Sequence, residues 1–142
     1  MTYISHSVSE TEALGEQLGR RLRSGDVVAY LGGLGMGKTA FTRGLARGMG
    51  CQDRVTSPTF TIVNEYRGEL PLFHFDMYRI PDSDALFDIG WEDYLDRRGV
   101  CAVEWSENVA DAMPAGTVYV TIRRHGENDN WREITVEGGD AL

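Results

Sequence analysis

The sequence predicts a single α/β domain over residues 1–142. Its central mixed, mainly parallel β-sheet is flanked by helices and is followed by a C-terminal β-hairpin. Three observations support this class. The length of 142 residues is that of one ordinary domain. The apolar run "DVVAYL" (26–31) is followed by glycines and then by a helical pattern, which makes a β–α unit. Further apolar and β-branched runs follow, so expected strands outnumber expected helices.

The first elements are a helix and a buried strand. Residues 9–23 are expected to be helical, because leucines recur every four residues on one face. Ser9 and Glu12 have the spacing of a capping box at the start of this helix. The run at 26–31 is short, apolar and rich in valine, which is typical of a strand buried on both faces.

A second helix is expected over residues 38–50, although Gly44 and Gly48 weaken the pattern, since each costs about 1 kcal/mol relative to alanine. The remaining expected elements, in chain order, are strands at 59–68 and 69–78, short helices within 82–99, a strand at 100–105, and a hairpin of 117–124 and 131–138 around the turn "HGENDN".

Composition limits the possible functions. The chain carries 22 acidic and 14 basic side chains, a net charge of −8. An acidic surface repels phosphate backbones, so no strong direct binding to nucleic acid is expected, and a role in a nucleic-acid pathway would need protein partners. The alternative is that the acidic charge merely aids solubility. No apolar run approaches the roughly 20 residues that span a bilayer, and the N-terminus lacks the order of a secretory signal. We therefore expect a cytoplasmic protein with no membrane contact, in which Cys51 and Cys101 are buried free thiols.

The clearest motif lies between the first strand and the second helix. "GLGMGKT", with Gly32 before it, satisfies G-x-x-x-x-G-K-[ST]. The glycines tolerate positive φ, so that backbone N–H groups curl around phosphate oxygens at a helix N-terminus. Lys38 is the only lysine among the basic residues, and its compact ammonium reaches phosphates where the planar fork of arginine would not fit. The expected ligand-binding residues of this loop are Gly33, Leu34, Gly35, Met36, Gly37, Lys38 and Thr39, with the Thr39 hydroxyl directed to Mg²⁺.

A nucleoside-triphosphate site also needs a carboxylate that holds Mg²⁺ or its waters, usually at the end of a buried strand. Asp76 and Glu104 each end an expected strand. One carboxylate would hold the metal and the other would activate water, and the residues alone do not show which does which. The alternative for each is an ordinary acidic residue at the surface. His74 alternates with Asp76 on one face, either as a structural histidine or to orient Asp76 or a water.

The segment "TSPTF" offers another candidate. Pro58 pushes the residue before it toward an extended conformation, which presents Thr59 at the mouth of a strand. A hydroxyl in that place can sense the γ-phosphate and Mg²⁺ as switch segments do. The alternative is a turn that only begins the strand.

Five blocks in order, "GGLGMGKTAF", "VTSPTFTIVNEY", "FHFDMYR", "FDIGWEDYL" and "AVEW", resemble the TsaE (YjeE) family of bacterial P-loop ATPases. They cover the chain from about Gly32 to Trp105. The resemblance implies a P-loop NTPase-like domain with ATP and Mg²⁺ as cofactors and a weak intrinsic ATPase activity that partners stimulate. It also implies a role with TsaD and TsaB, as the TsaB–TsaD heterodimer, in the threonylcarbamoyladenosine (t6A37) modification of tRNA. The transfer itself belongs to TsaD.

The resemblance also implies roles for single residues. The catalytic set is Lys38, Asp76, Glu104 and Thr59, and the metal-associated set is Thr39, Asp76 and Glu104. Trp105 is expected near the nucleotide or at the partner surface, and Arg132 near the nucleotide. Gly33 and Ala40 depart from the family pattern, which has Asp or Asn and a second threonine there, but neither removes a group that the mechanism requires.

Other functions compete with this hypothesis. A small-molecule kinase shares the phosphate loop, but it needs an arginine-rich lid, and the segment after Asp76 is acidic. A GTPase would need an N-K-x-D motif, which cannot exist because Lys38 is the only lysine. A scaffold that binds ATP without turnover stays open.

Overall fold

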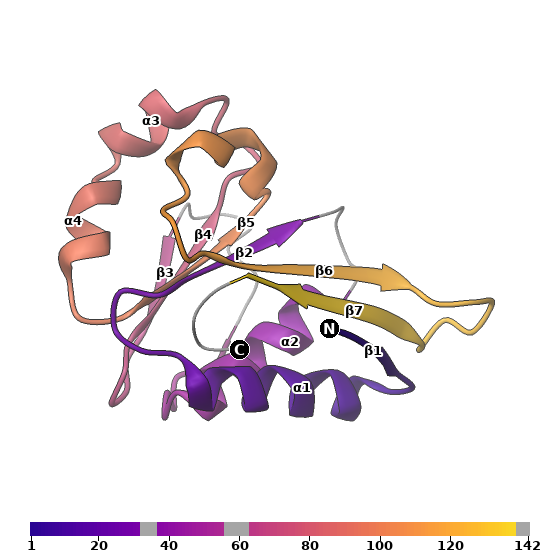
Figure 1. Cartoon of the computed structure of the whole chain (residues 1–142). Helices are drawn as coiled ribbons and strands as arrows, with labels where there is room; N and C mark the ends of the chain where they lie inside the picture. The colour runs from indigo at the N-terminus through magenta and orange to yellow at the C-terminus, as the bar shows by residue number, and fades with distance from the viewer. Residues whose placement is uncertain (32–36, 56–62, 139–142) are drawn as a thin grey trace.

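The computed structural model describes residues 1–31, 37–55 and 63–138, and the helices and strands are labelled in Figure 1. The strands are β1 (Thr2–Ser5), β2 (Val27–Leu31), β3 (Val63–Tyr66), β4 (Leu72–Asp76), β5 (Val100–Glu104), β6 (Val118–Arg124) and β7 (Arg132–Glu137). The helices are α1 (Val8–Arg21), α2 (Lys38–Gly48), α3 (Ser83–Asp88), α4 (Trp91–Asp96) and the 3₁₀ helix η1 (Ser106–Ala112).

The seven strands form one mixed sheet in the order β1-β7-β6-β2-β5-β4-β3. The four central strands β6, β2, β5 and β4 are parallel, because β2 pairs with both β5 and β6 and β5 pairs with β4. The outer pairs β1–β7, β6–β7 and β3–β4 are antiparallel. This arrangement confirms the expected fold class, including the hairpin of β6 and β7.

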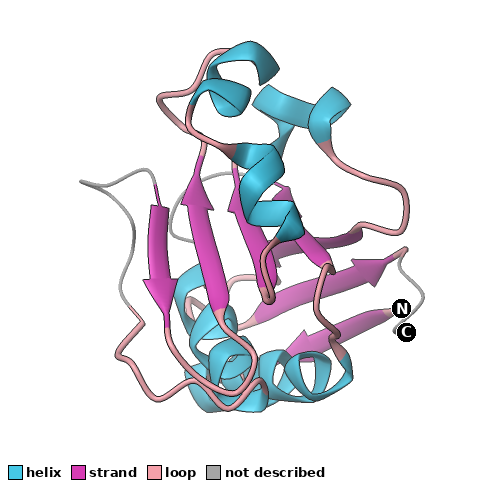
Figure 2. Ribbon diagram, turned by 90° about the vertical axis from the view of Figure 1, so that its left-hand side faces the viewer, coloured by secondary structure: helices cyan, strands magenta, loops and turns pink. Residues whose placement is uncertain are grey.

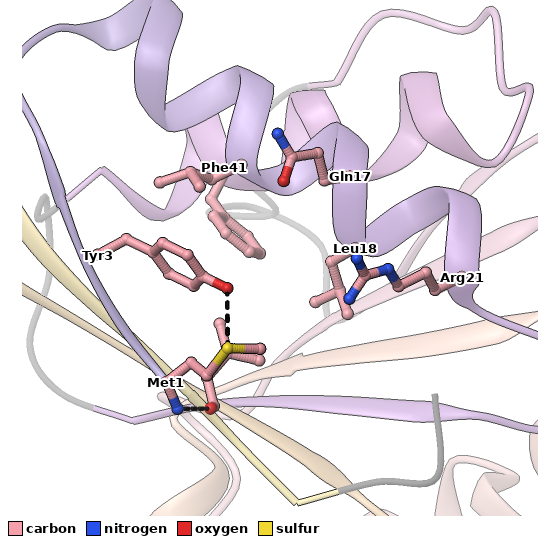
Figure 3. A pocket seen from close by; sticks show the side chains of 8 residues that line it. Met1, Tyr3, Gln17, Leu18, Arg21 and Phe41 are labelled. Atoms are coloured by element: carbon pink, nitrogen blue, oxygen red, sulfur yellow. Dashed lines mark hydrogen bonds between the residues drawn. The ribbon is translucent and has the colours of Figure 1, made fainter. Parts of the chain in front are cut away.

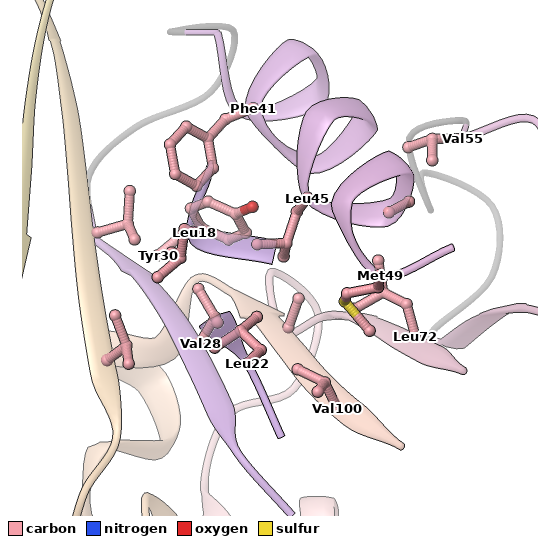
Figure 4. Close-up of a cluster of buried hydrophobic side chains, with 14 of the residues drawn as sticks. Leu18, Leu22, Val28, Tyr30, Phe41, Leu45, Met49, Val55, Leu72 and Val100 are labelled. Atoms are coloured by element: carbon pink, nitrogen blue, oxygen red, sulfur yellow. The ribbon is translucent and has the colours of Figure 1, made fainter. Parts of the chain in front are cut away.

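Helices cover both faces of the sheet. Figures 1 and 2 show α1 and α2 together on one side and α3, α4 and η1 on the other. Successive side chains of a strand point to opposite faces, so neighbours in β2 enter different cores: Val28 and Tyr30 pack with α1 and α2, and Val27 packs with the other helices. Figure 4 shows the first core, with Phe41 and Leu45 of α2 above β2. Across the described residues, no helix is long and apolar enough to cross a membrane.

The start of α1 differs from the expectation. Ser7, not Ser9, is the N-cap, and its hydroxyl accepts a hydrogen bond from the backbone N–H of Glu10 at 3.1 Å. Ser7 and Glu10 have the same spacing as Ser9 and Glu12, so the sequence offered two overlapping signals. Glu12 instead lies on the α2 side of the helix, where it accepts hydrogen bonds from arginines of α2.

Helices α1 and α2 touch backbone to backbone through two glycine pairs. Gly15 and Gly19 of α1 face α2, and Gly44 and Gly48 of α2 face α1. A Cβ atom added at any of the four would lie within 2.3 Å of a backbone carbonyl oxygen of the other helix, and at Gly44 within 1.9 Å of the Glu12 oxygen. Gly44 and Gly48, which weakened the expectation of a helix, are therefore what allows α2 to pack.

Strand β1 is an element that the sequence pattern did not reveal. It pairs with β7 and lies beside α1, where Tyr3 donates a hydrogen bond to the Met1 sulfur at 3.4 Å (Figure 3). The residues drawn in Figure 3 line a cavity of about 30 Å³. Pockets for small molecules have roughly 300–1,000 Å³, so this cavity is a packing gap and no ligand site.

Gly44→Ala tests the helix contact. Alanine is the better helix former by about 1 kcal/mol, yet we expect the variant to lose more than about 2 kcal/mol of unfolding free energy, because its methyl group overlaps the Glu12 carbonyl. Urea denaturation measures the change. Gln17→Ala on the exposed side of α1 is the control and should stay within about 0.5 kcal/mol. A Gly44→Ala protein as stable as the parent would contradict the backbone contact.

Candidate functional site

The ends of strands β4 and β5 and the start of α2 come together at one edge of the sheet. Gly37 is the N-cap of α2 with φ +96°, a conformation that favours glycine, and it supplies no side-chain cap to the first turn. Lys38, the first residue of α2, is 3% exposed. Asp76 and Glu104 are the last residues of β4 and β5 and are direct neighbours in the parallel register. The positions along each strand place both carboxylates on the α2 face.

Burial and charge act in opposite directions on the Lys38 amine. Burial lowers the pKa of Lys38 from its ordinary value, and the carboxylates of Glu104, Glu107 and Asp76 oppose that shift. The Lys38 Nζ also lies 5.5 Å from the ring centroid of Trp105, a cation–π contact. The amine is thus held between acidic groups and an aromatic ring.

Each strand-end carboxylate has one oxygen in contact with a nearby nitrogen. Asp76 Oδ1 accepts a hydrogen bond from the backbone N–H of Tyr78 at 2.9 Å. Glu104 is 9% exposed, and its Oε2 lies 2.6 Å from Nε2 of the fully buried His74. The histidine therefore contacts Glu104, whereas the sequence left open a structural role or the orientation of Asp76 or a water.

Trp105 follows Glu104 directly and has a left-handed backbone conformation, with φ +58°. Among the described residues other than glycine, it alone has a positive φ. Its ring packs against Tyr78, with centroids 5.1 Å apart, and its Nε1 is buried without a hydrogen-bond partner in the described part of the chain. The turn from β5 into η1 thus places an indole beside the Lys38 amine.

Arg132 reaches the same region from the far side of α2. A Cβ atom at Gly37 would lie 3.7 Å from Arg132 Nε, a buried group without a hydrogen-bond partner among the described residues. Its Nη1 donates to the backbone oxygens of Asp129 and Trp131. A cavity of about 40 Å³ adjoins this contact, and the residues that line it are Val8, Thr11, Gly37, Ala40, Asn130 and Arg132. The sequence did not indicate this cavity, because its lining comes from three separate segments.

The structure therefore brings together most of the expected site. The residues that lie around the start of α2 are Gly37, Lys38, Thr39, Asp76, Glu104, Trp105 and Arg132. Gly33, Leu34, Gly35, Met36 and Thr59 lie outside the described residues. The part of the chain that the structure describes holds no group of three or more His, Cys, Asp or Glu side chains suited to a metal ion. The carboxylates of Asp76 and Glu104 with the hydroxyl of Thr39 suit a hard cation such as Mg²⁺, which typically keeps waters and phosphate oxygens as its other ligands.

A direct hydrogen bond joins β2 to α2. The hydroxyls of Tyr30 and Thr42 lie 2.6 Å apart, and both residues are fully buried. Ser106 of η1 donates to the Tyr30 backbone oxygen at 2.9 Å. Because of these bonds, the strand before the loop, the helix after it and the turn that carries Trp105 are fixed to one another.

A glycine-rich segment between the central parallel strand β2 and helix α2, with acids at the ends of neighbouring strands, defines a P-loop NTPase-like protein. The family model described as "Threonylcarbamoyl adenosine biosynthesis protein TsaE" matches residues 5–134. The chain belongs to the TsaE family.

Curated relatives and a solved structure agree with this assignment. A protein of Treponema pallidum named "tRNA threonylcarbamoyladenosine biosynthesis protein TsaE" is 43% identical over 136 residues, which cover 96% of this chain and 99% of the relative. A protein of the same name from Bacillus subtilis is 42% identical over 127 residues, covering 89% of this chain and 78% of the relative. The crystal structure of Bacillus subtilis YdiB matches with a TM-score of 0.78 and 34% identity, covering 97% of this chain and 84% of that one.

Tyr30→Phe tests the bond between β2 and α2. It leaves the buried Thr42 hydroxyl without this partner, so we expect a loss of about 1–3 kcal/mol of unfolding free energy. The double variant with Thr42→Val should cost at least about 0.5 kcal/mol less than the sum of the single variants. Tyr119→Phe on the adjacent strand β6 is the matched control. Strict additivity of the two single changes would contradict the coupling.

Proposed function

We propose that this chain is a cytoplasmic, Mg²⁺-dependent ATPase that acts with TsaD and TsaB in the t6A37 modification of tRNA. We infer a weak intrinsic activity that the TsaB–TsaD heterodimer stimulates. The observation that carries the proposal is the convergence of Lys38 with Asp76 and Glu104 at the start of α2, in a chain of the TsaE family.

Phosphate binding rests on the first turn of α2. The N–H groups of that turn have no side-chain cap at Gly37, and the helix dipole adds positive potential there. Lys38 would exchange its present acidic neighbours for the β- and γ-phosphate oxygens of ATP. Arg132 lies against Gly37 at this turn and would contact the nucleotide there.

Thr39, Asp76 and Glu104 are the residues that would hold Mg²⁺ or its waters. When bound, the ion would neutralise phosphate charge in the transition state. The carboxylate that does not hold the ion would accept a proton from the attacking water. Thr59 remains the proposed γ-phosphate sensor.

Charge distribution supports action through protein partners. Residues 76–112 carry ten acidic and three basic side chains, a net charge of −7 against −8 for the whole chain. This segment contains α3, α4 and η1, which cover the second face of the sheet next to the strand ends. Because that lobe repels phosphate backbones, direct docking of tRNA beside the site is disfavoured.

Lys38→Ala and Lys38→Arg should each weaken MgATP binding at least about tenfold, the worth of one charge-assisted hydrogen bond. The arginine variant keeps the charge but not the compact shape. Isothermal titration calorimetry measures the affinity, with Arg123→Ala on the exposed part of β6 as the control. Unchanged affinity in both lysine variants would refute the phosphate-loop assignment.

The pathway role is tested by reconstituting tRNA modification under multiple-turnover conditions, with TsaB and TsaD and with or without this chain. The parent chain should restore turnover and its Lys38→Ala variant should not. Phosphate transfer to a metabolite, with no effect of the partners on ATP use, would favour a small-molecule kinase. Restored modification without ATP hydrolysis would favour a nucleotide-binding scaffold.

Asp76→Ala and Glu104→Ala should each lower the Mg²⁺-dependent kcat at least about tenfold. The melting temperature should change less than for a core substitution, because both residues lie at strand ends. Asp88→Ala, at the exposed end of α3, is the control. Normal turnover in both variants would remove these carboxylates from the site.

A further inference from the structure

The buried histidine of β4 has no role in the proposed function. His74 is fully buried, and its Nε2 lies 2.6 Å from Glu104 Oε2. We propose that His74 is a positioning residue that fixes the orientation of the Glu104 carboxylate beside Lys38, the first residue of α2. This inference rests on the proposed function, and it deepens that function by assigning what holds one of its two acids.

The strand register explains how the two side chains meet. Asp76 lies opposite Glu104 in the parallel pair, and His74 lies opposite Ala102, two residues before Glu104. These residues point to the same face of the sheet. Since Ala102 carries only a methyl group, the histidine ring has room to approach the Glu104 side chain diagonally.

The contact with Glu104 indicates which ring nitrogen carries a proton. A carboxylate only accepts hydrogen bonds, so the nitrogen that lies 2.6 Å from Glu104 Oε2 is the protonated one. Both ring nitrogens are buried, and neither makes a hydrogen bond of good geometry within the described residues. The approach of Nε2 to Glu104 is therefore a close polar contact, and it is the contact that the inference rests on.

The Glu104 carboxylate therefore interacts with both the histidine and the lysine. Its Oε2 lies against His74, and its charge acts on the Lys38 amine. Asp76 is held in a parallel way, because its Oδ1 accepts from the Tyr78 N–H. Asp76 is thus oriented by a backbone N–H, whereas Glu104 is oriented by a side chain. Of the two contacts, only the one to Glu104 can be removed by substituting its partner, His74.

Three variants test the inference. His74→Phe fills a similar volume without a donor, and His74→Gln restores an N–H donor near the position of Nε2. His125→Phe is the matched control, since His125 lies at the surface with a glutamate 3.9 Å away. We expect His74→Phe to lower kcat about 10- to 100-fold with KM for ATP changed less than about threefold. His74→Gln should recover most of kcat, and His125→Phe should change neither constant.

A second measurement does not depend on activity. The chain has three histidines, so nitrogen NMR of the nucleotide-free protein resolves the tautomer of each. We expect the proton of His74 on Nε2, with a nitrogen shift that moves in Glu104→Ala and stays unchanged in Asp76→Ala. An Nδ1–H tautomer, or a shift that ignores Glu104→Ala, would overturn the inference. So would a wild-type kcat in a folded His74→Phe protein. If the parent chain hydrolyses no ATP, the proposed function fails, and the NMR result alone decides whether His74 holds Glu104.

Discussion

The backbone contact between α1 and α2 is the constraint on which the position of the site depends. Helix α2 begins with Lys38, so whatever fixes α2 also fixes the lysine. On one side its glycines contact the backbone of α1, and on the other Phe41 and Leu45 enter the core between α2 and β2. Glu12 of α1 adds ion pairs to Arg43 and Arg47 at the rim, at 2.7 and 3.3 Å. Such exposed pairs contribute little, so the close approach of the backbones carries most of the constraint.

The alternating strand pattern explains why polar groups can end a buried sheet. In β4 and β5, the positions that face α2 begin apolar, with Leu72, Val100 and Ala102. They then become His74, Asp76 and Glu104 toward the ends of the strands. The opposite face stays apolar to Phe75 and Val103, which pack beneath α3, α4 and η1. The carboxylates therefore emerge on one face only, beside Lys38, while the other face continues as core.

The sequence predicted the helices and the strands of the parallel core because their signals are local. It missed β1, since four residues with one buried side chain form no period, and their pairing with β7 joins the two ends of the chain. It also missed η1, which has no helical period. At the site, the sequence predicted the loop motif and the strand-end acids, because parallel strands end at a common edge of the sheet. It did not predict the contact between His74 and Glu104, because the choice between Glu104 and Asp76 depends on the strand register and on the small size of Ala102.

The surroundings of Lys38 explain why the described site can be assembled before any ligand binds. Burial of the charged amine, with 3% exposure, is costly, and the neighbouring carboxylates of Glu104, Glu107 and Asp76 offset part of that cost. Under the proposed function, a triphosphate brings new anions to the lysine, and the acids then face surplus negative charge unless a cation accompanies the nucleotide. The binding of the triphosphate would thus strengthen the binding of Mg²⁺ at this site, and the reverse. His74 matters in that exchange, because it holds Glu104 in place while the charge partner of the carboxylate changes from the lysine to the metal.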